Sequence, residues 1–159
     1  MRVAIALAPV ALLATSCGGG KSDPYAASLA KGSEHVEAKG TVFAGGTWVP
    51  FTESGDFTNE PDRGRITLRL KGQSFHQVVT RRYVYMQQPS GAWKRVPLAG
   101  RGLSPQTPAQ IFRTRPTATI VDGLVSHIEI SNSNVHMSVD FSKYGEPVSI
   151  TVPRVKGSK

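Results

Sequence analysis

The stretch that decides the fold is residues 135–152, which read VHMSVDFSKYGEPVSITV. Apolar residues occupy every second position from Val135 to Phe141 and again from Val148 to Val152, with polar residues between them. A period of two residues is typical of a β-strand with one buried and one exposed face. The residues between the two runs include glycine and proline, which turns require. We therefore predict two strands joined by a tight turn, in which Gly145 supplies a positive φ.

The same alternation continues toward the N-terminus. It is clear at residues 66–71 and 127–130, and weaker strand candidates lie at residues 36–43, 55–58, 75–80, 83–87 and 92–96. The connections between these segments are short and carry turn residues. Successive strands should therefore pair mostly antiparallel, because a parallel pair needs a crossover of about a dozen residues.

Two segments depart from this period and favour short helices. Residues 25–32 are rich in alanine and end at Gly32, which suits a helix C-terminus. Residues 105–114 follow a capping Ser104 and begin with Pro105, which suits the first helical position. The sequence thus predicts a mainly β fold. We expect a curved antiparallel sheet or half-barrel of about eight strands, with two short helices covering its concave face. A closed small barrel is the alternative.

The first residues indicate export and lipid anchoring. Met1-Arg2 gives a positive start, residues 3–14 are uncharged and almost wholly apolar, and the sole cysteine, Cys17, follows small residues. This pattern resembles a bacterial lipoprotein signal peptide, cut before a cysteine whose thiol carries diacylglycerol. The apolar run would span about 18 Å as a helix, short of the roughly 30 Å hydrocarbon core, so it does not predict a spanning helix. An ordinary secretory signal with an incidental cysteine is the alternative.

These signals divide the chain. Residues 1–16 are expected to be a signal peptide, residues 17–24 a flexible tether, residues 25–155 one β-rich domain and residues 156–159 a disordered tail. Two acyl chains on Cys17 would give stable anchoring, since each buried CH₂ contributes about 0.8 kcal/mol. The expected location is the extracytoplasmic side of a bacterial membrane.

Charge and motifs argue against several other functions. The chain carries 19 Lys and Arg against 11 Asp and Glu, but the basic residues are dispersed and no nucleic-acid motif is present, so no nucleic-acid partner is expected. His127, Glu129 and His136 lie on polar strand faces; a surface metal site is conceivable there, and a solvated face is the simpler interpretation. Residues 72–76 approach a nucleophile elbow but end in His76 where glycine belongs. We predict no catalytic residues, metal or cofactor.

Several short motifs resemble the LolA/LolB-like half-barrel superfamily, in particular the LppX/LprG type of bacterial surface lipoprotein, in a shortened form. The best match is the C-terminal third, where residues 135–153 resemble the family's last hairpin. Residues 122–125 resemble its aspartate-glycine turn. Residues 83–86 and 91–94 resemble its tyrosine strand and glycine-tryptophan hairpin, and Ser104-Pro105 its helix start.

The resemblance implies a membrane-anchored envelope lipoprotein that binds or relays an apolar ligand such as a lipid acyl chain. The face expected to line an apolar cavity bears Leu68, Tyr85, Ile130, Met137 and Val139, since alternation places these residues opposite charged ones. The alternative is a non-enzymatic structural or interaction lipoprotein, in which the same sheet has a filled core and binds an envelope protein.

Overall fold

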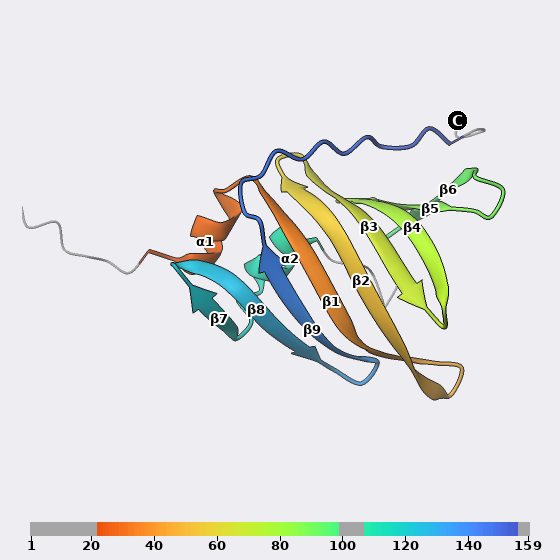
Figure 1. Ribbon diagram of the computed structural model, residues 1–159, viewed down its shortest axis with the longest axis horizontal. Helices are drawn as coiled ribbons and strands as arrows, with labels where there is room; N and C mark the ends of the chain where they lie inside the picture. The colour runs from red at the N-terminus through yellow and green to blue at the C-terminus, as the bar shows by residue number, and fades with distance from the viewer. Residues whose placement is uncertain (1–21, 99–106, 156–159) are drawn as a thin grey trace, which may run out of the picture.

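A twisted antiparallel sheet dominates the computed structural model, which describes residues 22–98 and 107–155 (Figure 1). Its nine described strands are β1 (Ser33–Ala44), β2 (Thr47–Asn59), β3 (Asp62–Leu70), β4 (Gln73–Thr80), β5 (Tyr83–Gln87), β6 (Trp93–Pro97), β7 (Ala118–Val121), β8 (Leu124–Ser131) and β9 (Val135–Ser142). The helices are α1 (Pro24–Leu29) and α2 (Pro108–Arg113).

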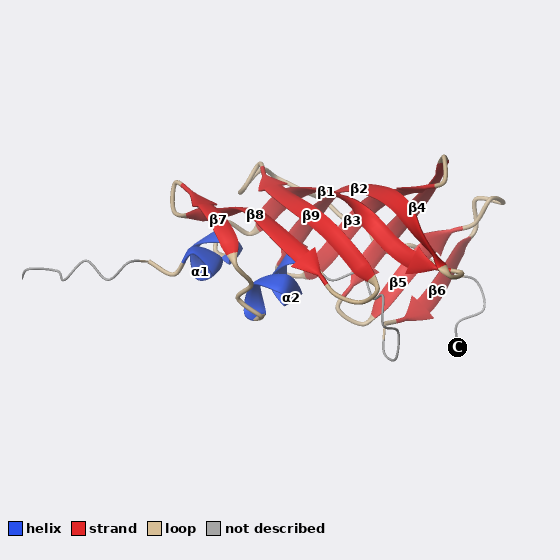
Figure 2. Ribbon diagram, turned by 90° about the horizontal axis from the view of Figure 1, so that it is seen from below, coloured by secondary structure: helices blue, strands red, loops and turns tan. Residues whose placement is uncertain are grey.

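The sheet is open, with the strand order β6-β5-β4-β3-β2-β1-β9-β8-β7. All neighbouring strands pair antiparallel. Within the described ranges β6 and β7 form the two edges and do not pair with each other, so the curved open sheet is correct and the closed barrel is wrong. Figure 2 shows the sheet arching, with both helices on the side toward which β5 and β6 turn.

The register defines two faces. The inner face carries Val36 and Ala38 of β1 and their partners Phe141 and Val139 of β9. The outer face carries the alternate residues, such as His35 and its partner Asp56. We use these two names below.

The core lies between the inner face and the helices. Phe112 of α2 is 1% exposed and packs between the rings of Tyr25 and Phe141, whose centroids lie 5.8 and 5.0 Å away. Ser28 of α1 accepts a hydrogen bond from the backbone N–H of Val125 at 2.9 Å. Both helices therefore close one end of the inner face, over β8, β9 and the start of β1 (Figure 1).

Both predicted helices exist, with shifted starts. Asp23 caps α1, since its Oδ1 accepts from the N–H of Tyr25 at 3.1 Å. Helix α2 begins at Pro108, and Thr107 is its N-cap residue. This is the same combination of a capping residue and a proline that was expected at Ser104 and Pro105, which lie outside the described ranges. No helix in the described ranges is long and apolar enough to cross a membrane.

The predicted last strand, residues 148–152, is wrong. Gly145 has φ +77 in the turn after β9, as predicted, but the chain then leaves the sheet. Residues 146–155, here called the C-terminal strap, form no strand and cross toward β4 (Figure 1). Ile150 packs on Val78 and Tyr85 of the outer face. The alternation at 148–152 therefore reflects a segment that buries one side, although no strand pairs with its backbone.

Candidate apolar ligand cavity

A partly open cavity of about 360 Å³ lies on the inner face and reaches from helix α2 toward the β1–β2 hairpin. Phe57 and Phe141 line its helix-covered end together with Ile111 of α2. Val42 and Val135, a cross-strand pair near the β1–β2 hairpin, line its other end. Its volume falls near the lower end of the roughly 300–1,000 Å³ of small-molecule sites. The described residues that line the cavity are mostly apolar, which suits an apolar ligand.

Four of the five residues expected to face an apolar cavity line it. They are Leu68, Ile130, Met137 and Val139. The first three are partly exposed and form its accessible wall, whereas Val139 is 2% exposed and belongs to the floor.

Tyr85 was expected on the same face and lies on the other one. Its register partner is Val78, and both side chains pack beneath Ile150 of the C-terminal strap. Strand β5 has buried apolar residues on both sides, because Val84 faces the inner core while Tyr85 meets the strap. Alternation of polarity therefore could not assign its faces.

Glu53 is an ionisable residue of the cavity wall that sequence reasoning missed. It lies on β2 between Ala38 of β1 and Leu68 of β3, its register partners on the inner face. Burial raises the pKa of Glu53 to about 7 from an ordinary 4.5. The available signal was its phase: Glu53 occupies the same strand face as Phe51 and Phe57, at intervals of two and four residues. That part of the strand was not recognised, because the strand was expected to begin only at residue 55.

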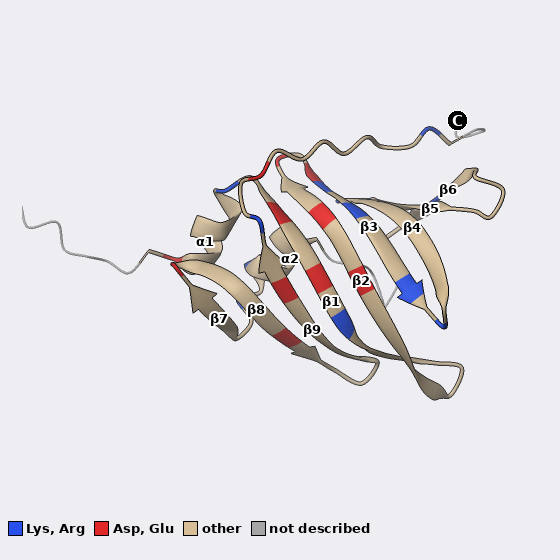
Figure 3. Ribbon diagram, viewed as in Figure 1, with Lys and Arg blue, Asp and Glu red and all other residues tan. Residues whose placement is uncertain are grey.

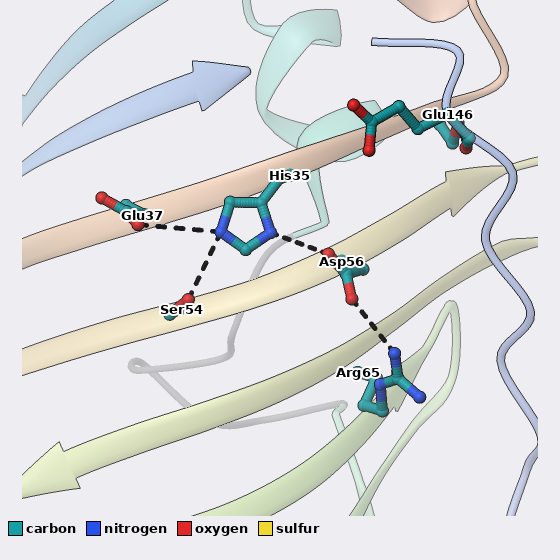
Figure 4. A network of polar contacts seen from close by, with 7 residues as sticks. His35, Glu37, Ser54, Asp56, Arg65 and Glu146 are labelled. Carbon is teal, nitrogen blue, oxygen red and sulfur yellow. Dashed lines mark hydrogen bonds and ion pairs between the residues drawn. The ribbon is translucent and has the colours of Figure 1, made fainter. Parts of the chain in front are cut away.

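The outer face carries a polar network centred on His35 (Figure 4). His35 Nδ1 lies 2.7 Å from Asp56 Oδ1, and its Nε2 lies 3.4 Å from Ser54 Oγ and 3.8 Å from Glu37 Oε1. Arg65 Nη2 donates to Asp56 Oδ2 at 3.1 Å. Burial acts to raise the pKa of Asp56, but the hydrogen bonds from His35 and Arg65 outweigh it and hold that pKa below its ordinary value.

Ser54, His35 and Asp56 thus stand in the order of an acyl-transfer triad. That chemistry also needs N–H groups aimed at a developing oxyanion. Here β2 pairs with β1 on one side and β3 on the other, so the backbone N–H groups around Ser54 point toward neighbouring strands. The network is therefore suited to holding three strands in register rather than to acyl transfer.

Acidic residues continue across β1, β8 and β9 (Figure 3). His127 lies 2.6 Å from Asp140 and 3.0 Å from Glu129, and these hydrogen bonds raise the pKa of His127. His136 does not join them: its Nδ1 lies 2.6 Å from Ser131 Oγ, and its ring packs on Trp48. In the part of the chain that the structure describes, no three His, Cys, Asp or Glu side chains are arranged so that they could hold a metal ion. Cys17, the expected lipidation site, lies outside the described residues.

No protein-family model matches the chain, and no curated protein matches it in sequence. Among solved structures it resembles the crystal structure of LprF from Mycobacterium bovis, with a TM-score of 0.52 and 15% sequence identity. The match covers 82% of this chain and 93% of the LprF chain. At this identity the likeness establishes a shared fold. The chain therefore shares the fold of LprF, a match in keeping with the lipoprotein resemblance that the short sequence motifs indicated.

Proposed function

We propose that this protein is a membrane-anchored envelope lipoprotein whose inner-face cavity binds or relays an apolar ligand such as a lipid acyl chain. The observation that carries the proposal is the cavity of about 360 Å³ lined by Leu68, Ile130 and Met137. A close-packed interior leaves few voids larger than a water molecule. A ligand tail placed there would gain about 0.8 kcal/mol for each CH₂ removed from water.

The remaining parts of the proposal concern location and mode of action. Diacylation at Cys17 would hold the protein on the extracytoplasmic side of the membrane, where lipid is available. In this proposal the protein acts by binding its ligand, and the polar network around His35 serves to hold β1, β2 and β3 together. The alternative, an interaction lipoprotein with a filled core, is less favoured because the inner face is only partly filled.

Binding of an uncharged fluorescent probe, N-phenyl-1-naphthylamine, tests the proposal. The assay uses the mature chain, residues 17–159, with Cys17→Ser so that no acyl chain is attached; this chain keeps every described helix and strand. Leu68→Trp should fill the cavity and abolish probe binding. Arg69→Trp, the adjacent outer-face position, is the matched control and should bind like the wild type. The proposal would be overturned if the Cys17→Ser chain without a cavity substitution bound no probe, or if Leu68→Trp bound the probe as well as that chain does.

A further inference from the structure

We propose that Glu53 determines the specificity of this cavity: it selects apolar ligands whose polar group is a hydrogen-bond donor, an ammonium above all, over ligands that end in a carboxylate. This inference rests on the proposed function, and it deepens that function by naming a ligand class. Acyl chains alone would not require a carboxyl group on the wall.

The first step is the placement of Glu53. Its neighbours across the two strand pairings, Ala38 and Leu68, are apolar and line the same cavity. The next inner-facing residue on β2 is Gly55, which has no side chain to approach it. No described residue makes a hydrogen bond or ion pair with the Glu53 carboxyl group. Glu53 is partly buried, and its unpaired carboxyl group on the cavity wall can accept a hydrogen bond from a ligand.

The second step is the charge around Glu53. Among the described residues that line the cavity, Glu53 is the one ionisable residue; Gln77 and Asn132 are neutral polar lining residues. The facing elements contribute apolar side chains, including Ile111 from α2 and Met137 from β9.

Other charged groups lie off the cavity. Arg113 of α2 and Lys94 of β6 are exposed and do not line it. Glu34, on the inner face of β1, pairs in register with Phe57 at the helix-covered end. The described residues therefore leave the charge of Glu53 without a compensating cation.

The third step is chemical complementarity. An ammonium or hydroxyl group on the ligand would donate to Glu53, and an ammonium would also neutralise its charge; such charge-assisted hydrogen bonds are about twice as strong as neutral ones. A ligand carboxylate would place two like charges in a site of low dielectric, which disfavours both ionised forms. The carboxyl group thus discriminates between head groups that carry the same chain.

Three probes that carry the same twelve-carbon alkyl chain and differ only in head group test this inference: dodecylamine, dodecanol and tridecanoic acid. Each competes with N-phenyl-1-naphthylamine for the mature Cys17→Ser chain at pH 8. The wild type should prefer the amine over the acid by at least about tenfold, equivalent to about 1.4 kcal/mol, with the alcohol between them. Glu53→Gln should reduce that ratio to about twofold or less.

Two comparisons isolate the role of Glu53. Glu37→Gln removes an equal charge from the outer face, where the side chain is 71% exposed, and should retain the preference. In the wild type the preference for amine over acid should grow from pH 5.5 to pH 8, because Glu53 ionises in that window. In Glu53→Gln the preference should change with pH only as far as the probes' own head groups titrate.

Equal affinity for the amine and the acid in the wild type, or a preference that survives Glu53→Gln, would overturn the inference while leaving the apolar cavity function intact. Failure of N-phenyl-1-naphthylamine itself to bind would instead remove the proposed function, and the inference with it.

Discussion

Replacing Glu34 by glutamine should make the stability of this protein less dependent on pH. Glu34 is completely buried at the start of β1. One carboxylate oxygen, Oε2, accepts a hydrogen bond from Asn59 Nδ2 at 3.0 Å, while Oε1 has no partner in the described ranges. Burial raises the pKa of Glu34 to about 7, the nearby charge of Asp62 adds to that effect, and the Asn59 hydrogen bond opposes it.

The sign follows from proton linkage. Because the folded-state pKa of Glu34 lies above its ordinary value of 4.5, the folded state holds the proton more tightly than the unfolded state. The free energy of unfolding therefore falls as pH rises from about 4.5 through about 7 and changes little above that. Between pH 5 and pH 8 the ionisation of this one group should cost about 2–3 kcal/mol.

Glu34→Gln removes that charge and can still accept from Asn59. We expect it to stabilise the fold by about 2–3 kcal/mol more at pH 8 than at pH 5. Urea unfolding of the mature Cys17→Ser chain, followed by circular dichroism at both pH values, measures the difference. Glu37→Gln on the outer face serves as control and should change stability by less than about 0.5 kcal/mol at either pH. A change that is equal at pH 5 and pH 8 for Glu34→Gln would refute the argument.

Three further predictions concern the backbone, the C-terminal strap and the anchor. Gly40→Ala should cost at least about 3 kcal/mol in urea unfolding, because the new Cβ would lie 2.6 Å from Met137 Cβ and closer still to the His136 carbonyl oxygen. Gly145→Ala should cost only about 1–2 kcal/mol for its positive φ, and equal costs would contradict this contrast. Ile150→Ala should cost about 2 kcal/mol, the lower end for a buried isoleucine; an unchanged unfolding midpoint would mean that the strap does not pack as described. Cys17→Ser should shift the protein from the membrane to the soluble fraction or leave an uncleaved precursor. A variant that fractionates and migrates like the wild type would exclude the anchor.

Strand positions could be predicted where one face is buried and the other is solvated. Residues 135–141 show this pattern without interruption, and they form β9 as expected. Residues 148–152 show it equally well, yet Ile150 is buried by Val78 and Tyr85 with no strand pairing. Periodicity reports which side chains are covered, and not whether the covering surface offers backbone hydrogen bonds.

Other features escaped because their local sequences break the expected pattern. Strand β7 contains Ile120 and Val121, which are 41% and 54% exposed, so hydrophobicity did not mark a buried face. Strand β2 passes through Pro50, an unusual strand residue, and its first half was not recognised. Glu53 lies in that half. The unpaired carboxyl group of the cavity was therefore missed although the apolar wall around it was found.

Native mass spectrometry of the protein purified from its own membrane tests the central claim most directly. We predict that an apolar molecule co-purifies in stoichiometric amount and that Leu68→Trp, which fills the cavity, loses it, while Arg69→Trp retains it. Wild-type protein that carries no apolar molecule beyond the acyl groups on Cys17, and that binds none when lipid extract is added, would contradict the account.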